Sequence, residues 1–376
     1  MPLYMLKKMY ALKKLNPLTR RAFLDKQQDK PHSSLKKQPV YRKTLMFAGL
    51  SLAGLTLVTP LIATADVSKR KDVGKFIDQM VEKHQFDRAK LTQVFSKVEI
   101  NDSIIKAITR PAEGKPWHEY RPIFLTESRI KEGVEFWNEH AAELQRAYET
   151  YGVPPHIVVA IIGVESKYGR YKGKYPVINA LTTLGFDYPK RSKFFKRELE
   201  EYLLLAREEK VDPMSMKGSY AGAMGKPQFI ASSYRAYAQD FDGDGKRDLL
   251  DNTVDTIGSV ANYFKRHKWL KDEPVVSLAS VKGTQYKAVV KKGIKPNISL
   301  EKLIKKGVTI NDQHNPEQKT ALIELETKTG KEHWVAFNNF YVITRYNHSK
   351  LYAMAVYQLS EAITKRRAET LNNKKR

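Results

Sequence analysis

The chain has 376 residues, of which 41% are hydrophobic and 10% aromatic. This composition excludes an intrinsically disordered chain and allows two domains or one large one. Lysine and arginine outnumber aspartate and glutamate by 66 to 41, so the formal net charge is +25. The chain has no cysteine, which excludes disulfides, thiolate metal sites, a cysteine nucleophile and lipoprotein-type acylation.

The positive charge is unevenly distributed. Residues 1–43, a basic N-terminal extension, carry a net charge of +10, and the rest of the chain carries +15. No basic block in the folded part alternates with aromatic residues as a single-strand groove would, so we expect no nucleic-acid partner. The diffuse positive charge favours polyanions such as a bacterial cell wall or a membrane surface.

Residues 44–65 have the pattern of an export signal. Tyr41-Arg42-Lys43 precedes an apolar stretch from Leu45 to Val58, and Ala63-Thr64-Ala65 is a small-x-small cleavage site. The alternative is an uncleaved anchor that associates with the membrane through residues 44–62. We therefore expect a periplasmic protein, soluble after cleavage near Ala65 or anchored to the inner membrane, and not a lipoprotein.

Helical patterns dominate residues 66–274. Apolar residues from Ile130 to Tyr148 recur at spacings of three and four, which predicts an amphipathic helix that Gly152 ends. Pro154-Pro155 then opens an apolar run, Ile157–Val164. Proline at its start and glycine beyond its end favour a buried helix over a buried strand.

The pattern changes between residues 275 and 337. Lysine-glycine pairs punctuate this segment, and 321–326 and 332–337 flank a turn in the manner of a β-hairpin. Helical patterns resume over residues 338–376. We expect a mainly α protein of the α+β type, in which a small β-containing insertion interrupts a helical domain.

Glu165 follows directly on the apolar run and is a candidate general acid. Burial disfavours a charged carboxylate and raises its pKa, and a carboxyl that keeps its proton near neutral pH can donate it. The alternative is that Glu165 is the first exposed residue where the helix reaches the surface, a role that the residue alone does not exclude.

The segment 240–251 follows the EF-hand loop pattern and predicts a Ca²⁺ site. Carboxylates at loop positions one, three and five converge on one cation, glycine at position six permits the turn, and position seven contributes a main-chain carbonyl. The candidate ligands are Asp240, Asp242, Asp244, Lys246, Asp248 and Asp251, with Asp255 as a second candidate for the last position. A single such loop is typical of a structural site. No organic cofactor is expected.

A glycine-rich segment, Gly218–Gly225, allows close approach of a ligand or of a neighbouring helix. It lacks the Gly-Lys-Ser/Thr of a P-loop and the glycine spacing of a dinucleotide-binding turn. Tyrosines are abundant, and an aromatic face with a hydroxyl group suits a sugar ring. Five lie near polar residues: Tyr120, Tyr220, Tyr263, Tyr346 and Tyr352.

Four ordered motifs together resemble the lytic murein transglycosylase B family over roughly residues 72–366. They are Ile161–Ser166; Gly218–Gly225 with Gln228-Phe229; the acidic loop followed by Ile257–Phe264; and Asn338–Tyr341 running into Arg345-Tyr346-Asn347. The resemblance implies a lysozyme-like helical domain with an EF-hand-type loop and a small β-domain. It also implies cleavage of the β-1,4 bond between N-acetylmuramic acid and N-acetylglucosamine in peptidoglycan, leaving a 1,6-anhydromuramic end.

The resemblance also assigns roles to residues. Glu165 matches the catalytic acid/base of the family. Glycan-cleft positions are matched by Tyr120, Ser219, Gln228, Tyr263, Tyr346, Asn347 and Tyr352, and Phe229 and Tyr220 are further candidates. The chain departs from the family by lacking a lipid-attachment cysteine, by one extra residue before Asp255, and by Lys226-Pro227 before Gln228.

These features predict a single-carboxylate mechanism on peptidoglycan strands, with cell-wall synthesis proteins as possible further partners. Three other functions stay open. One is a muramidase that hydrolyses the same bond with water. Another is a non-catalytic peptidoglycan-binding protein stabilised by calcium. The third is a calcium-responsive interaction protein.

Overall fold

The computed structural model describes residues 66–109 and 115–375. The expected N-terminal extension and export segment lie outside these residues. The buried hydrophobic residues form two clusters, and all of them lie between Val67 and Ile363. Residues 66–376 therefore contain both hydrophobic cores of the folded part. Within the described ranges, no helix combines the length and the apolar character needed to cross a bilayer.

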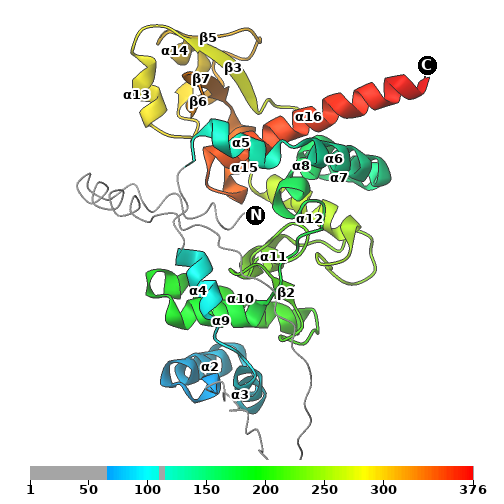
Figure 1. The fold of residues 1–376 in the computed structure, drawn as a ribbon, viewed down its shortest axis with the longest axis vertical. Helices are drawn as coiled ribbons and strands as arrows, with labels where there is room; N and C mark the ends of the chain where they lie inside the picture. The colour runs from blue at the N-terminus through cyan, green and yellow to red at the C-terminus, as the bar shows by residue number, and fades with distance from the viewer. Residues whose placement is uncertain (1–65, 110–114, 376) are drawn as a thin grey trace, which may run out of the picture. The chain divides into compact units, whose positions relative to one another are not determined.

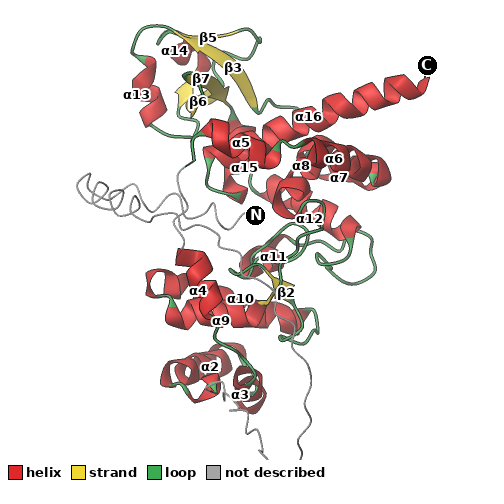
Figure 2. Ribbon diagram, in the orientation of Figure 1, coloured by secondary structure: helices red, strands yellow, loops and turns green. Residues whose placement is uncertain are grey.

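Helices make up most of the described chain (Figures 1 and 2). The helices before and after the five-stranded sheet are α2 Lys71–His84, α3 Arg88–Ser96, α4 Asp102–Thr109, α5 Trp117–Phe124, α6 Glu127–Glu139, α7 Ala141–Tyr151, α8 Pro155–Ser166, α9 Val177–Asp187, α10 Ser192–Glu208, α11 Ala231–Tyr237, α12 Thr253–Arg266, α15 Asn338–Tyr346 and α16 Lys350–Lys375. Short strands β1 (Tyr175–Pro176) and β2 (Lys217–Gly218) form an antiparallel pair between them.

Helix α8 lies at the centre of the larger core. Pro155 occupies its first turn, where a missing N–H leaves no hydrogen bond unmade. Every residue from Ile157 to Ser166 is buried, because α6, α7, α12 and α16 all pack against this helix. The apolar run is therefore a buried helix, as its flanking proline and glycine predict, and Glu165 lies in its last turn.

A five-stranded antiparallel sheet forms between Val276 and Ala336. Its order is β4-β6-β7-β3-β5, and its elements are β3 Val276–Val281, α13 Tyr286–Lys291, β4 Ile298–Ser299, α14 Leu300–Ile304, β5 Val308–Ile310, β6 Lys319–Glu326 and β7 Lys331–Ala336. Strands β6 and β7 form the predicted hairpin, in which Glu326 pairs with Lys331. The chain then returns to the helices α15 and α16.

The two faces of this sheet pack against different partners. Ile323 and Ala336 belong to the large core that contains α8, whereas Leu322 and Val335 belong to a second core. Alternating side chains point to opposite faces of a strand, so β6 and β7 each contribute to both cores. Helices α13 and α14 complete the second core through residues such as Val289 and Leu303.

Candidate functional site

Glu165 is buried at the C-terminal end of α8, with 3% of its surface exposed. The helix ends one residue later, at Ser166, because Lys167 and Tyr168 both adopt left-handed backbone conformations (φ 52° and 58°). Such consecutive non-glycine residues are strained, and strain of this kind concentrates at functional sites. The Tyr352 hydroxyl donates a hydrogen bond to Glu165 Oε1 over 3.0 Å.

Four buried tyrosine hydroxyls interact electrostatically with the carboxylate of Glu165. They come from separate elements and are Tyr120, Tyr263, Tyr346 and Tyr352. Burial is the largest cause that raises the pKa of each hydroxyl, and the negative charge of Glu165 raises it further. All four therefore stay protonated at neutral pH and can donate hydrogen bonds.

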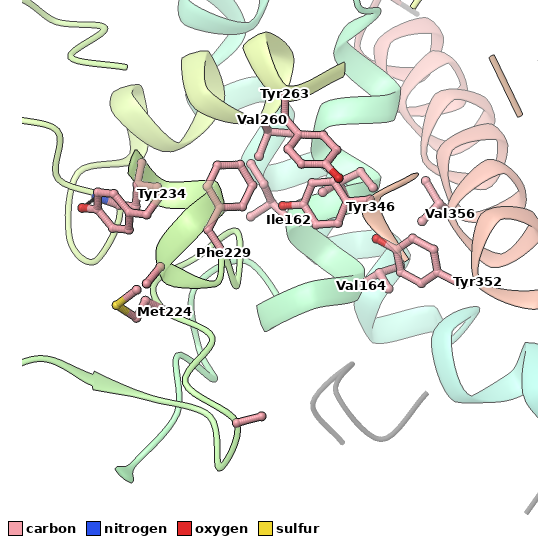
Figure 3. Close-up of a cluster of buried hydrophobic side chains, with 14 of the residues drawn as sticks. Ile162, Val164, Met224, Phe229, Tyr234, Val260, Tyr263, Tyr346, Tyr352 and Val356 are labelled. Atoms are coloured by element: carbon pink, nitrogen blue, oxygen red, sulfur yellow. Dashed lines mark hydrogen bonds between the residues drawn. The ribbon is translucent and has the colours of Figure 1, made fainter. Parts of the chain in front are cut away.

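Two of these tyrosines are fixed by hydrogen bonds to the backbone. Tyr263 donates to the Arg345 carbonyl and Tyr346 donates to the Pro227 carbonyl, each over 2.7 Å. Their rings pack on Phe229, with centroids 5.6 and 5.8 Å from its ring. Figure 3 shows these three rings together beside Ile162 of α8. Phe229 is itself only 2% exposed, so it supports the tyrosines from within the core.

Unpaired polar groups lie in the same region. The Tyr120 hydroxyl and both polar atoms of the Asn347 side chain are buried and make no hydrogen bond within the described residues. Buried polar groups are nearly always paired, and an unmet one costs about 1–3 kcal/mol. Such groups fit a site that a polar ligand completes.

The glycine-rich segment folds into a tight turn against α9, where Val177 and Leu181 lie next to Gly218 and Gly222. The Ser219 hydroxyl accepts hydrogen bonds from the backbone N–H groups of Ala221 and Ala223, and Ser219 is buried. Gly218 permits this turn, because a Cβ there would lie 2.5 Å from the Ala223 carbonyl oxygen. Tyr220 is also buried, which raises the pKa of its hydroxyl.

Gln228 follows this turn in a left-handed conformation (φ 53°). Its side-chain amide donates to the carbonyls of Lys172 and Gly225, over 3.2 and 2.9 Å. Within the described chain, the side-chain oxygen of Gln228 accepts no hydrogen bond. The structure thus brings the four buried tyrosines close to Glu165. Ser219 and Gln228 lie on the loop of the glycine-rich segment.

Sequence reasoning missed a hydrogen-bonded connection between the end of α8 and this loop. The Ser166 hydroxyl donates to the Lys226 carbonyl over 2.7 Å and accepts from Gly169 N–H over 2.9 Å. Lys226 Nζ donates to the Asp251 carbonyl and to Thr253 Oγ1, over 2.6 and 2.5 Å. Ser166, the residue after Glu165, is therefore connected through Lys226 to the end of the acidic loop. The one sequence feature that could have indicated this connection is the polar residue Ser166 directly after Glu165.

A second missed feature also holds α8 in place. Arg129 donates to the Gly163 carbonyl over 3.0 Å and to the Ile123 carbonyl at the end of α5 over 2.7 Å. The ring of Tyr168 covers Gly163, and the Tyr168 hydroxyl donates to the Arg129 carbonyl. Gly163 could have been noticed as the one glycine inside the apolar run.

The acidic loop brings three carboxylates together. Oxygens of Asp240, Asp242 and Asp244 lie within 4.8 Å of one another, and all three side chains are exposed. Gly243 and Gly245 have left-handed conformations that turn the loop around them. Hard carboxylate oxygens at this spacing suit Ca²⁺, so the residues fit the predicted ion.

The other predicted ligands have different surroundings. Both oxygens of Asp255 accept backbone hydrogen bonds, from Phe241 and Asp248, each over 2.7 Å. Asp251 forms an ion pair with Lys172 over 2.6 Å, and Asp248 accepts from the N–H groups of Leu250 and Asp251. Asp248, Asp251 and Asp255 therefore do not belong to the cluster that Asp240, Asp242 and Asp244 form. Lys246 donates its N–H to Asp244.

Comparison with known proteins identifies the family. The family model described as "Transglycosylase SLT domain" matches residues 68–361. The chain belongs to this family. It is 43% identical to the membrane-bound lytic murein transglycosylase B of Escherichia coli over 314 residues, which are 81% of this chain and 86% of that protein. The expected membership of the lytic murein transglycosylase B family, and with it an enzyme of that class, is confirmed.

Solved structures agree with the fold. Catenated lytic transglycosylase SltB1 of Pseudomonas aeruginosa is 50% identical, with a TM-score of 0.78, over 80% of this chain and all of that one. E. coli Slt35 in complex with calcium is 43% identical, with a TM-score of 0.74, over 81% and 96%. P. aeruginosa SltB3 in complex with NAG-anhNAM-pentapeptide is 29% identical, with a TM-score of 0.69, over 77% and 78%. The expected lysozyme-like helical fold with a small sheet is confirmed.

Proposed function

We propose that this enzyme cleaves the β-1,4 bond between N-acetylmuramic acid and N-acetylglucosamine in peptidoglycan and forms a 1,6-anhydromuramic end. The observation that carries the proposal is the buried carboxyl of Glu165, held by the Tyr352 hydroxyl. The complex of the relative SltB3 with NAG-anhNAM-pentapeptide supports the anhydro product.

Glu165 would act first as an acid. Burial favours its protonated form, and the proton passes to the glycosidic oxygen as the bond from that oxygen to C1 breaks. The N-acetyl carbonyl of the substrate would stabilise the positive charge on C1, as in substrate-assisted glycosidases. Within the described residues, the buried amide of Asn347 and the Tyr120 hydroxyl make no hydrogen bond, so both are available to orient it.

Glu165 would then act as a base. The C6 hydroxyl of the muramic residue attacks C1, its proton passes to Glu165, and the starting protonation state returns. Within the described residues, Glu165 is the only carboxylate whose charge raises the pKa of Tyr120, Tyr263 or Tyr346. One carboxylate suffices for this route, because intramolecular attack has a large effective-concentration advantage over attack by water.

We also propose that the acidic loop binds a structural Ca²⁺. Asp240, Asp242 and Asp244 would hold it with the main-chain carbonyl of Lys246, and Asp251 or Asp255 is the candidate for the last ligand. A bound cation would offset the repulsion between three neighbouring carboxylates and so stabilise the loop. The calcium complex of the relative Slt35 supports this assignment. Action on peptidoglycan implies a periplasmic location.

The test compares residues 66–376 with the Glu165→Gln variant on purified peptidoglycan, with mass spectrometry of the released muropeptides. We expect products one water lighter than hydrolytic ones from the wild type, and none from a folded variant that still binds sacculi. Full-mass reducing products would instead establish a muramidase. Absence of products from both folded proteins would establish the binding-protein alternative.

A further inference from the structure

One short segment of the folded part is strongly basic. Residues 282–306 contain eight lysines, one acidic residue and no arginine, so they contribute +7 of the +15 that follows residue 43. The lysines are Lys282, Lys287, Lys291, Lys292, Lys295, Lys302, Lys305 and Lys306.

These lysines are available to a partner. All are exposed except Lys306, which is half-buried. Lys305 pairs with Glu301, and none of the other seven forms an ion pair within the described chain. Lysines that repel one another without local compensation raise the potential of the surface that carries them.

The segment covers the sheet face that points away from the α8 core. Helices α13 and α14 supply Val289, Leu300 and Leu303 to the second core, and the lysines of both helices lie outside it. Figure 2 shows both helices beside the strands of the sheet. The Lys282 N–H donates to the Gly307 carbonyl over 2.8 Å, so the two ends of the segment lie side by side.

One apolar side chain is exposed among the lysines. Ile304 ends α14 with 48% of its surface exposed, and it lies between Lys302 and Lys305 in the sequence. Cationic side chains around an exposed aliphatic group are typical of surfaces that lie in a membrane interface, where the apolar group enters the headgroup region.

We propose that the lysine face, residues 282–306, docks the enzyme onto an anionic phospholipid membrane. The absence of arginine argues against bidentate recognition of single carboxylates, such as those of a peptide stem, because lysine acts as a point charge. A membrane with many phosphates satisfies dispersed point charges without a fixed geometry. The opposite face of the sheet packs on the large core that contains α8 and Glu165. Docking through the lysine face therefore leaves the helices around Glu165 unobstructed.

The test measures flotation of residues 66–376 with phosphatidylcholine vesicles that either contain or lack phosphatidylglycerol. We expect binding only to the anionic vesicles, and weaker binding as salt rises. The triple variant Lys287→Gln, Lys291→Gln, Lys292→Gln should lower the partition coefficient by about 100-fold, since each lysine near such a surface contributes roughly fivefold. Ile304→Ser should lower it further.

The matched control changes the same charge elsewhere. Lys71, Lys75 and Lys97 are exposed and lie outside this face, so replacing all three by Gln should leave vesicle binding within about twofold of the wild type. Thermal unfolding and muropeptide release from soluble glycan strands should match the wild type in both triple variants. Equal losses in the two triple variants would overturn the proposal. So would loss of binding to purified sacculi or duplex DNA with unchanged binding to vesicles.

Discussion

The Tyr352 hydroxyl and Glu165 Oε1 form a 3.0 Å hydrogen bond between residues 187 positions apart. Tyr352 lies in the first turn of α16, after the sheet, and Glu165 lies at the end of α8. Both side chains are buried, so water does not compete for this bond. The bond therefore sets the orientation of the carboxyl, and it favours the ionised form that the second half of the proposed reaction uses as a base.

Replacing Tyr352 by Phe keeps the ring and removes the hydroxyl. A hydrogen bond to a charged group contributes about 1.5–3 kcal/mol, so we expect kcat to fall roughly 10- to 100-fold with little change in KM. Steady-state release of muropeptides measures both. Tyr357→Phe, on the same helix, is the control and should keep wild-type kcat.

The same variant predicts a shift in the pH profile. Without the Tyr352 hydroxyl the ionised form of Glu165 is less favoured, so the carboxyl keeps its proton to higher pH. The loss of kcat on the alkaline side, where the acid is deprotonated, should therefore move to higher pH in Tyr352→Phe. A shift to lower pH would contradict the assignment of Glu165 as the proton donor.

Gly163 provides a test of how α8 is positioned. A Cβ at this position would lie 2.6–2.8 Å from the hydroxyl and ring atoms of Tyr168. We expect Gly163→Ala to lower the free energy of unfolding by about 1–3 kcal/mol, because overpacking forces a shift, and to lower kcat as the last turn of α8 moves. Chemical denaturation and muropeptide release measure the two effects.

Gly74 is the matched control for this substitution. It also lies inside a helix, α2, but nothing lies within 4 Å of a Cβ built there. Gly74→Ala should leave kcat unchanged and raise the free energy of unfolding by up to about 1 kcal/mol. Equal destabilisation by both substitutions would show that Tyr168 does not constrain Gly163.

Local patterns predicted much of the fold. The run Ile157–Val164 reads as a buried helix because proline and glycine flank it, and the hairpin of β6 and β7 follows from alternation around a turn. The meeting of Tyr120 and Tyr352 around Glu165 has no local cause. It depends on how α5, α8 and α16 pack, and the family resemblance supplied those residues before the structure did.

Contacts of the backbone were the part that sequence reasoning missed. Ser166, Lys226 and Arg129 act mainly through main-chain carbonyls, which every residue carries, so no residue pattern indicates the partner. Asp255 shows the same limit. Its carboxylate looked like a possible calcium ligand by spacing, yet its two oxygens accept N–H groups of the loop.

The proposed Ca²⁺ site predicts ligand-dependent stability. A ligand that binds only the folded state stabilises it by an amount that grows with the logarithm of its concentration, about 2.7 kcal/mol at 100 times Kd. Calcium should therefore raise the Tm of the wild type, and Asp242→Asn should abolish most of this shift. Glu135→Gln, an exposed carboxylate on α6, is the control and should keep it. A full calcium shift in Asp242→Asn would contradict the assigned ligands.

His156, in the first turn of α8, predicts a loss of stability in mild acid. Burial lowers its pKa to about 4 from the ordinary 6.5, so the unfolded chain binds this proton more readily than the folded one. The stability of the folded state should therefore fall as pH drops from about 6.5 towards 4, by up to about 2 kcal/mol between pH 7 and pH 5. Denaturation of the wild type and of His156→Gln at both pH values isolates this contribution. The variant should lose less stability than the wild type, and an equal loss would show that His156 is not the group responsible.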